Sequence, residues 1–192
     1  MINKIKEDIN KNINMTIKMF TPMKLSLYTI LLYFSITFFL PYIIYGISKV
    51  TNIGWYVNIG KSTFEQLNNL NINNKSVIGL FLLIFPHNLR IATILMFLAP
   101  FIVVYLGYIA YTAIVSSAVI YYISNANPKL FGLYGVSLVP HGLFELTGIS
   151  FIVYSGLYLY RKELKLFVKC YLVGAIILAI AGLIESLSIA LT

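Results

Sequence analysis

The sequence predicts an all-α membrane protein, a polytopic transmembrane helical bundle of about five spans, preceded by an N-terminal amphipathic interfacial helix. Of its 192 residues, 59% are hydrophobic and only 10% are charged, and the mean hydropathy is +0.86. A soluble domain of this length needs a charged surface that 14 basic and 6 acidic residues cannot provide. The apolar residues also occur in long uninterrupted blocks, as a hydrocarbon environment requires.

The lengths of the apolar blocks decide the number of spans. A helix rises about 1.5 Å per residue, so about 20 apolar residues cross a hydrocarbon core of about 30 Å. The apolar stretch 77–123 is therefore two spans, and Ala99-Pro100 is the place where it turns back. We predict spans at about 25–48, 77–98, 101–123, 135–160 and 166–191. An Asn-rich loop at 49–76, with a short helical pattern near 64–70, and a turn-rich loop at 124–134 separate them.

Residues 1–24 form a separate arm ahead of the bundle, which comprises residues 25–192. Apolar side chains recur in the arm at steps of three and four, with lysines elsewhere around the helix. These apolar residues are Ile2, Ile5, Ile9, Ile13, Ile17 and Phe20. The pattern predicts an amphipathic helix lying on the inner membrane surface, with a solvated tail as the alternative.

The basic residues predict the orientation. Nine of the 14 lie in the N-terminal arm or near residues 161–169, and five spans place both groups on the same side of the membrane. They are Lys4, Lys6, Lys11, Lys18, Lys24, Arg161, Lys162, Lys165 and Lys169. The positive-inside rule then places the N-terminus in the cytoplasm and the C-terminus outside, in a multi-pass protein of the plasma membrane. Because the basic residues flank hydrophobic blocks, the net charge of +8 favours anionic inner-leaflet headgroups as partner and not nucleic acid.

Ionisable side chains at membrane depth are costly and are therefore candidates for the functional site. The chain has five such residues: His87, Arg90, His141, Glu145 and Glu185. Helical rise brings all except Arg90 together in the outer half of the bundle. With Asn88 they are expected to form a buried polar network, in which Arg90 pairs with Glu145 or Glu185.

Two chemical alternatives remain open for these residues. His87, His141, Glu145 and Glu185 are ligand types that zinc accepts, although the nearby Arg90 opposes a cation. A proton or ion pathway through the same groups is the other alternative. No cofactor is expected, since the sequence has no Walker loop, H-E-x-x-H or G-x-S-x-G motif. Cys170 is the single cysteine, which excludes an intramolecular disulfide and a thiolate metal cluster.

Small residues predict that the fourth and fifth spans pack closely, because they let helix backbones approach. Those of the fourth span are Gly148, Ser155 and Gly156, and those of the fifth span are Ala175, Ala179, Gly182 and Ser186. Gly142 is a further predicted helix-packing position. Contact between these two faces would bring Glu185 near Glu145.

Three segments resemble elements of a known family. Val139 to Leu146 resembles the P-H-G-x-x-E-L signature of the stage II sporulation protein M family of integral membrane proteins. Phe85 to Ile91 resembles the family's Asn-containing element in the second span, and Gly182 to Glu185 resembles its acidic element in the last span. The resemblance covers residues 25–190. Many members have two adjacent Asn residues in the second span, where this chain has His87 and Asn88.

The resemblance implies a non-enzymatic membrane scaffold or assembly subunit of a membrane complex. In spore-forming bacteria the family recruits partners that degrade peptidoglycan during engulfment, and members also occur in organisms that make no spores. Other membrane proteins or a second copy of the chain are then the expected partners. Two other functions remain as alternatives: a small-solute or ion transporter subunit, and an intramembrane metal-dependent hydrolase.

Overall fold

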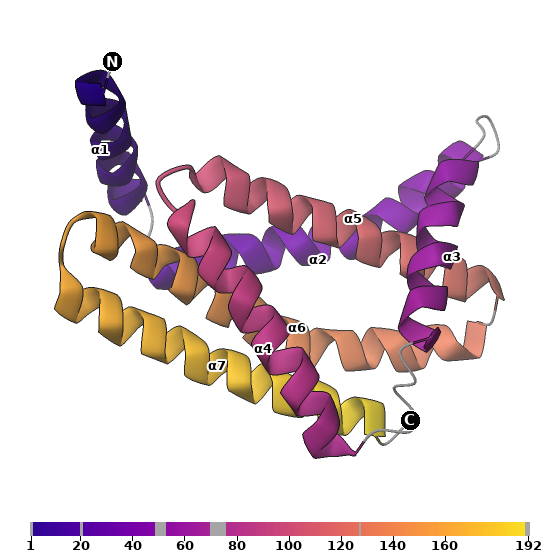
Figure 1. Ribbon diagram of the computed structural model, residues 1–192. Helices are drawn as coiled ribbons and strands as arrows, with labels where there is room; N and C mark the ends of the chain where they lie inside the picture. Colours follow the sequence, from indigo (N-terminus) through magenta and orange to yellow (C-terminus); the bar gives the residue numbers. More distant parts are fainter. Residues whose placement is uncertain (1, 20, 49–52, 70–75, 127, 191–192) are drawn as a thin grey trace.

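The protein was analysed as a computed structural model that describes residues 2–19, 21–48, 53–69, 76–126 and 128–190 (Figure 1). Every regular element in these ranges is a helix, and five of the helices are long and apolar enough to cross a membrane. The helices are α1 (Ile2–Met19), α2 (Pro22–Ser48), α3 (Gly54–Asn69), α4 (Val77–Phe97), α5 (Ile102–Ala126), α6 (Pro128–Tyr160) and α7 (Leu164–Ala190). The predicted fold class is confirmed, with α2, α4, α5, α6 and α7 as the five apolar helices.

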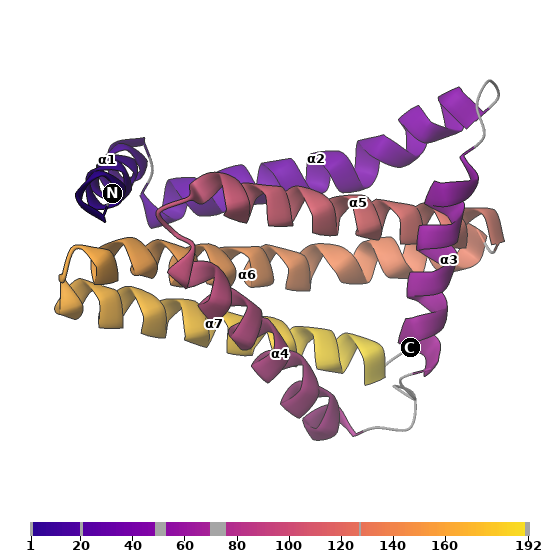
Figure 2. The ribbon, with the colours of Figure 1, turned by 45° about the horizontal axis from the view of Figure 1, so that its top comes forward.

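Helix α6 is the centre of the bundle. Within the apolar stretches, 61% of the residues of α6 are buried, against 17–28% in the other four helices. Figures 1 and 2 show α2, α5, α6 and α7 alongside one another, while α4 crosses α6 and α7 obliquely. Because α6 is central, its residues contact the other four apolar helices. These contacts bring together the residues of the site described below.

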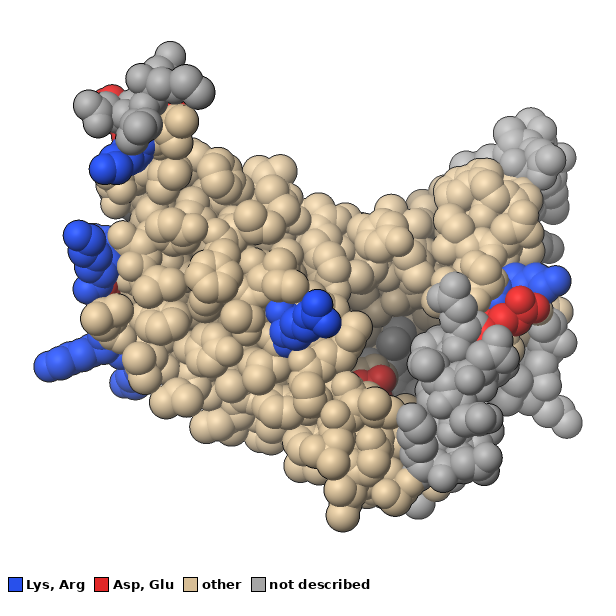
Figure 3. Space-filling model, viewed as in Figure 1, with Lys and Arg blue, Asp and Glu red and all other residues tan. Residues whose placement is uncertain are grey.

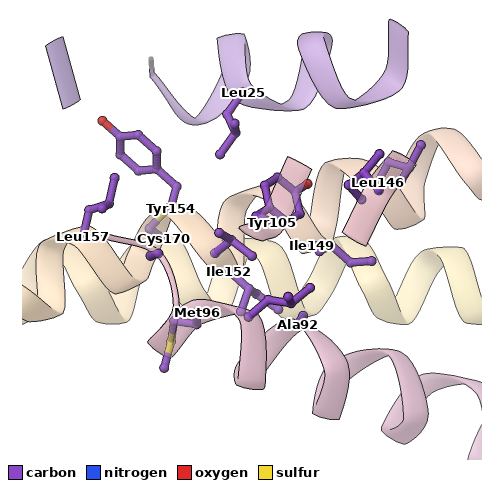
Figure 4. Close-up of a cluster of buried hydrophobic side chains, with 14 of the residues drawn as sticks. Leu25, Ala92, Met96, Tyr105, Leu146, Ile149, Ile152, Tyr154, Leu157 and Cys170 are labelled. Atoms are coloured by element: carbon purple, nitrogen blue, oxygen red, sulfur yellow. The ribbon is translucent and has the colours of Figure 1, made fainter. Parts of the chain in front are cut away.

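The hydrophobic core lies around the middle and second half of α6. Figure 4 shows side chains of α2, α4 and α5 converging on Ile149, Ile152 and Leu157 of α6. Ile152 and Leu157 are fully buried, as are Leu25 of α2 and Tyr105 of α5. This core holds the helices in register at the same level as the hydroxyl contacts of α6.

Two turns join the spans at the end of the bundle where α2 begins. Helix α4 ends at Phe97 and α5 begins at Ile102, so the chain reverses where the sequence predicts it. Between α6 and α7, Lys162 has a φ of 61°, and the N–H of Glu163 donates to the carbonyl of Tyr158 at 2.9 Å. This closure of the α6 C-terminus by a left-handed residue allows a very short connection.

The predicted loops at 49–76 and 124–134 were too long. Residues 54–69 form α3, and α6 already begins at Pro128, since proline has the correct φ for the first turn of a helix. Residues 49–52 and 70–75 of the first loop lie outside the described residues. Helix α3 packs on α5, where the buried Tyr56 hydroxyl donates to Ser117 at 2.8 Å. Burial raises the pKa of this Tyr56 hydroxyl above its ordinary value.

Helix α1 has the predicted amphipathic pattern, and part of its apolar face packs on the bundle. Ile13 is only 2% exposed and belongs to the core, whereas Ile5 is 48% exposed. Figure 1 shows that α1 stands at the end of the bundle where α2 begins. Basic side chains gather at this end in Figure 3, which we call the basic end; it includes Lys24 and the α6–α7 turn with Arg161.

Candidate functional site

Two helices present a histidine directly after a proline. Pro86 and His87 lie within α4, and Pro140 and His141 lie within α6. A proline inside a helix has no N–H to donate, so the carbonyl four residues earlier loses its helical partner. Both helices nevertheless continue through the proline. His87 lies at the middle of α4, and His141 lies in the half of α6 away from the basic end.

Four of the six predicted network residues come together, and we call His87, His141, Glu145 and Glu185 the carboxylate–imidazole cluster. Glu185 of α7 lies within electrostatic range of both histidines, and Glu145 of α6 lies within range of Glu185. Both glutamates are half-buried. Figure 3 shows an acidic side chain at the bottom of a hollow in the surface on this side of the bundle. Three helices therefore bring two carboxylates and two imidazoles to one place.

Two tyrosines that the sequence analysis did not single out adjoin the cluster. Tyr33 of α2 lies within electrostatic range of Glu145 and Glu185, and Tyr108 of α5 lies within range of Glu145. The Tyr33 hydroxyl also forms a hydrogen bond with Ser116 at 2.8 Å. All five apolar helices thus contribute to the surroundings of the cluster.

The predicted ion pair of Arg90 with Glu145 or Glu185 is wrong. In the described part of the chain the ion pairs are Lys61–Glu65 at 3.9 Å and Arg161–Glu163 at 3.1 Å, both outside the cluster. Arg90 is exposed and lines a groove between α4 and α7. Asn88 is half-buried on α4 and forms no hydrogen bond with the cluster among the described residues. The two carboxylates therefore lie together without an Arg or Lys ion-pair partner in the part of the chain that the structure describes.

The described residues contain no set of ligands for the metal site that was the first chemical alternative. No three His, Cys, Asp or Glu side chains in that part of the chain lie close enough to hold one metal ion. The candidate ligands His87, His141, Glu145 and Glu185 are thus near one another without forming such a group.

Uncharged hydroxyls form hydrogen bonds between the spans, and these residues were not predicted from the sequence. Ser150 of α6 forms hydrogen bonds with Thr29 of α2 at 2.9 Å and with Tyr105 of α5 at 2.8 Å. Ser26 donates to Thr147 at 3.0 Å on the same two helices. We call these five residues the hydroxyl network. A signal was present in the sequence, since Ser26, Thr29, Tyr33 and Thr37 follow one another at helical spacing along one face of the first span.

The predicted close packing of α6 and α7 is present, but with a different register. A Cβ added at Gly148 would lie 2.9 Å from the carbonyl oxygen of Gly174, and one added at Gly174 would lie 2.8 Å from that of Gly148. The buried seam of α7 therefore follows Gly174 and Leu178, while the predicted Ala175 and Ala179 are only half-buried. A shift of one residue turns a helix face by about 100°.

The three other predicted packing glycines contact α2 or α4. Gly156 of α6 faces the backbone of Met96 in α4, and Gly182 of α7 faces Phe81 and Phe85 in α4. Gly142 of α6 lies against Phe34 of α2 at 3.5 Å. Gly156 and Gly182 were predicted to join α6 to α7, and that assignment is wrong. Gly142 was predicted as a packing position without a named partner helix, and it lies against α2.

The fold and the cluster define a polytopic α-helical membrane protein with ionisable groups between its spans. The family model described as Stage II sporulation protein M matches residues 31–188, and the chain therefore belongs to this family. The match covers the carboxylate–imidazole cluster and the hydroxyl partners on α6, and it begins within α2. No curated protein and no solved structure matches the chain.

Proposed function

We propose that the protein is a non-enzymatic membrane scaffold or an assembly subunit of a membrane complex. The observation that supports this most is the close packing and hydrogen bonding of the bundle interior. Backbones touch at Gly148 and Gly174, and no buried side-chain nitrogen or oxygen in the described residues lacks a hydrogen-bond partner. An interior that is closely packed and fully paired holds its helices in one arrangement, which suits a protein that positions others.

The outer surface of the bundle offers room for partners. Phe39 of α2 is 67% exposed and Val103 of α5 is 76% exposed, and both belong to helices that are mostly unburied. Other membrane proteins or a second copy of the chain are the proposed partners at these faces, with lipid covering the remainder.

Photocrosslinking tests the scaffold proposal. A photoreactive amino acid at Phe39, Val103 or Leu172 reports on three different helix faces, and one at the buried Ile109 serves as the control. We expect a discrete protein adduct from at least one exposed face and none from Ile109. The same adduct should form in a Glu185→Gln variant, because a scaffold does not need an ionised group in the cluster. Lipid adducts alone from all three faces would contradict the proposal.

A subunit of a small-solute or ion transporter is the second candidate, and the carboxylate–imidazole cluster favours it. Paired carboxylates between spans are a common feature of proton and ion pathways. If this function is correct, Glu185→Gln should abolish growth under one solute condition while leaving the crosslinked adducts unchanged.

We further propose that the protein lies in the plasma membrane with the basic end in the cytoplasm and the C-terminus outside. In a Cys170→Ala background, a cysteine at Ser62 of α3 should react with an impermeant reagent in intact cells. A cysteine at Lys165, at the basic end, should react only after permeabilisation, and both positions are exposed in the folded chain. Reaction of position 165 from outside would reverse the assigned orientation.

A further inference from the structure

A groove of about 370 Å³ runs along one face of α4 beside α7. Leu89, Arg90, Thr93 and Phe97 line it from α4, at the spacing of a single helix face, and Tyr171 lines it from α7. The groove lies on the membrane-facing side of the bundle, and none of the four residues of the carboxylate–imidazole cluster lines it.

Arg90 is the charged group of the groove. It is exposed, and no carboxylate among the described residues lies within 4.0 Å of its guanidinium. Figure 3 shows a basic patch over α4, in the middle of a surface that carries no other charged side chain around it. An arginine on the outside of a membrane bundle needs an anionic partner or access to the interface.

The groove leads from Arg90 towards the basic end. Arg90 is seven residues before Phe97, where α4 ends, which is about 10 Å of helix. Tyr171 is likewise seven residues after Leu164, where α7 begins. The charge of Arg90 is therefore within reach of headgroups in the leaflet at that end, where the basic residues of the chain gather.

Hydrogen bonds fix the walls of the groove. The Thr93 hydroxyl donates to the carbonyl of Leu89 at 2.8 Å and also shares a hydrogen bond with the Tyr171 hydroxyl at 3.1 Å. At the basic end, the Tyr160 hydroxyl donates to the carbonyl of Phe97 at 2.7 Å. Helix α4 is thus tied to α7 at Thr93 and to α6 at Phe97, between Arg90 and the basic end.

We propose that this groove binds an anionic phospholipid from the leaflet at the basic end, with the lipid phosphate against Arg90 and an acyl chain running away from that end along Leu89 and Pro86. A guanidinium offers paired N–H donors that match phosphate oxygens. The apolar lining suits an acyl chain. The basic residues that gather at this end of the bundle repel a choline group and favour a headgroup with net negative charge.

Native mass spectrometry of the full chain tests the proposal. The protein is released from micelles that contain equal amounts of phosphatidylglycerol and phosphatidylcholine, and the retained lipids are counted. We expect wild type to retain phosphatidylglycerol preferentially, and Arg90→Gln to weaken this retention about tenfold, the loss of one charge-assisted contact. Arg90→Lys should retain an intermediate amount, since it keeps the charge and loses the paired geometry.

Lys61→Gln is the matched control, because it removes an exposed cation at the opposite end of the bundle. It should retain phosphatidylglycerol as wild type does. Circular dichroism of each variant reports folding, and the exposure of Arg90 leads us to expect folded variants. Equal retention by wild type and Arg90→Gln, or equal retention of both lipids by wild type, would overturn the proposal. Displacement of the lipid by millimolar inorganic phosphate would also overturn it and would assign the site to free phosphate.

Discussion

Replacing Gly156 with alanine is expected to lower the free energy of unfolding by about 3 kcal/mol, at the upper end of overpacking costs. The added methyl group would collide with the backbone carbonyl of Met96 and would lie 3.0 Å from the Cβ of Ala99. A backbone cannot rotate aside as a flexible side chain does, so the end of α4 must move away from α6. That movement also strains the hydrogen bond from Tyr160 to the carbonyl of Phe97.

Gly107 of α5 is the matched control for Gly156. A Cβ added there would meet no other atom within 4 Å, so Gly107→Ala should leave stability unchanged or raise it by about 0.5–1 kcal/mol through helix propensity. Thermal unfolding of both variants in one detergent measures the difference. Equal midpoints for the two variants would show that α4 and α6 are not in backbone contact at Gly156.

Much of the fold was predictable because a bilayer permits few backbone structures. The hydrocarbon core fixes the length of each span, and the turn at Pro100 follows from the length of stretch 77–123. Helix α3 was underestimated because its first half contains Gly54 and Gly60, and glycine is a poor helix former. Its stability comes from tertiary contacts such as Tyr56 with Ser117. Packing between helices cannot be derived from hydropathy alone.

The sequence predicts the level of each site residue along the bundle, but it does not predict the direction in which its side chain points. Alternating spans give the level of each residue along the bundle, so the meeting of Glu145, Glu185 and the two histidines followed from helical rise. The level does not say which way a side chain points, and Arg90, only three residues after His87, faces the α4–α7 groove instead. For the same reason, the face of α7 that packs on α6 was predicted at Ala175 but lies at Gly174.

The contribution of the hydroxyl network to stability is a separate prediction. We expect Ser150→Ala to lower the free energy of unfolding by about 2 kcal/mol, the cost of leaving a buried hydroxyl unpaired. Ser150 is fully buried and is the residue that connects Thr29 of α2 with Tyr105 of α5. Because Tyr105 is also fully buried, its hydroxyl cannot turn to water when Ser150 is truncated.

A double-mutant cycle separates this interhelical bond from simple loss of volume. Adding Tyr105→Phe to Ser150→Ala should restore about 1 kcal/mol, because no hydroxyl of Tyr105 then remains unpaired. Ser155→Ala is the matched control: Ser155 is fully buried in the same helix, but its hydroxyl donates to the carbonyl of Ile152 in α6 itself at 2.6 Å. Its removal should cost no more than about 0.5 kcal/mol, since no neighbouring helix loses a partner. Strictly additive losses for Ser150 and Tyr105 would mean that the hydroxyl network does not hold α5 to α6, and the glycine contacts would then be the main source of helix register.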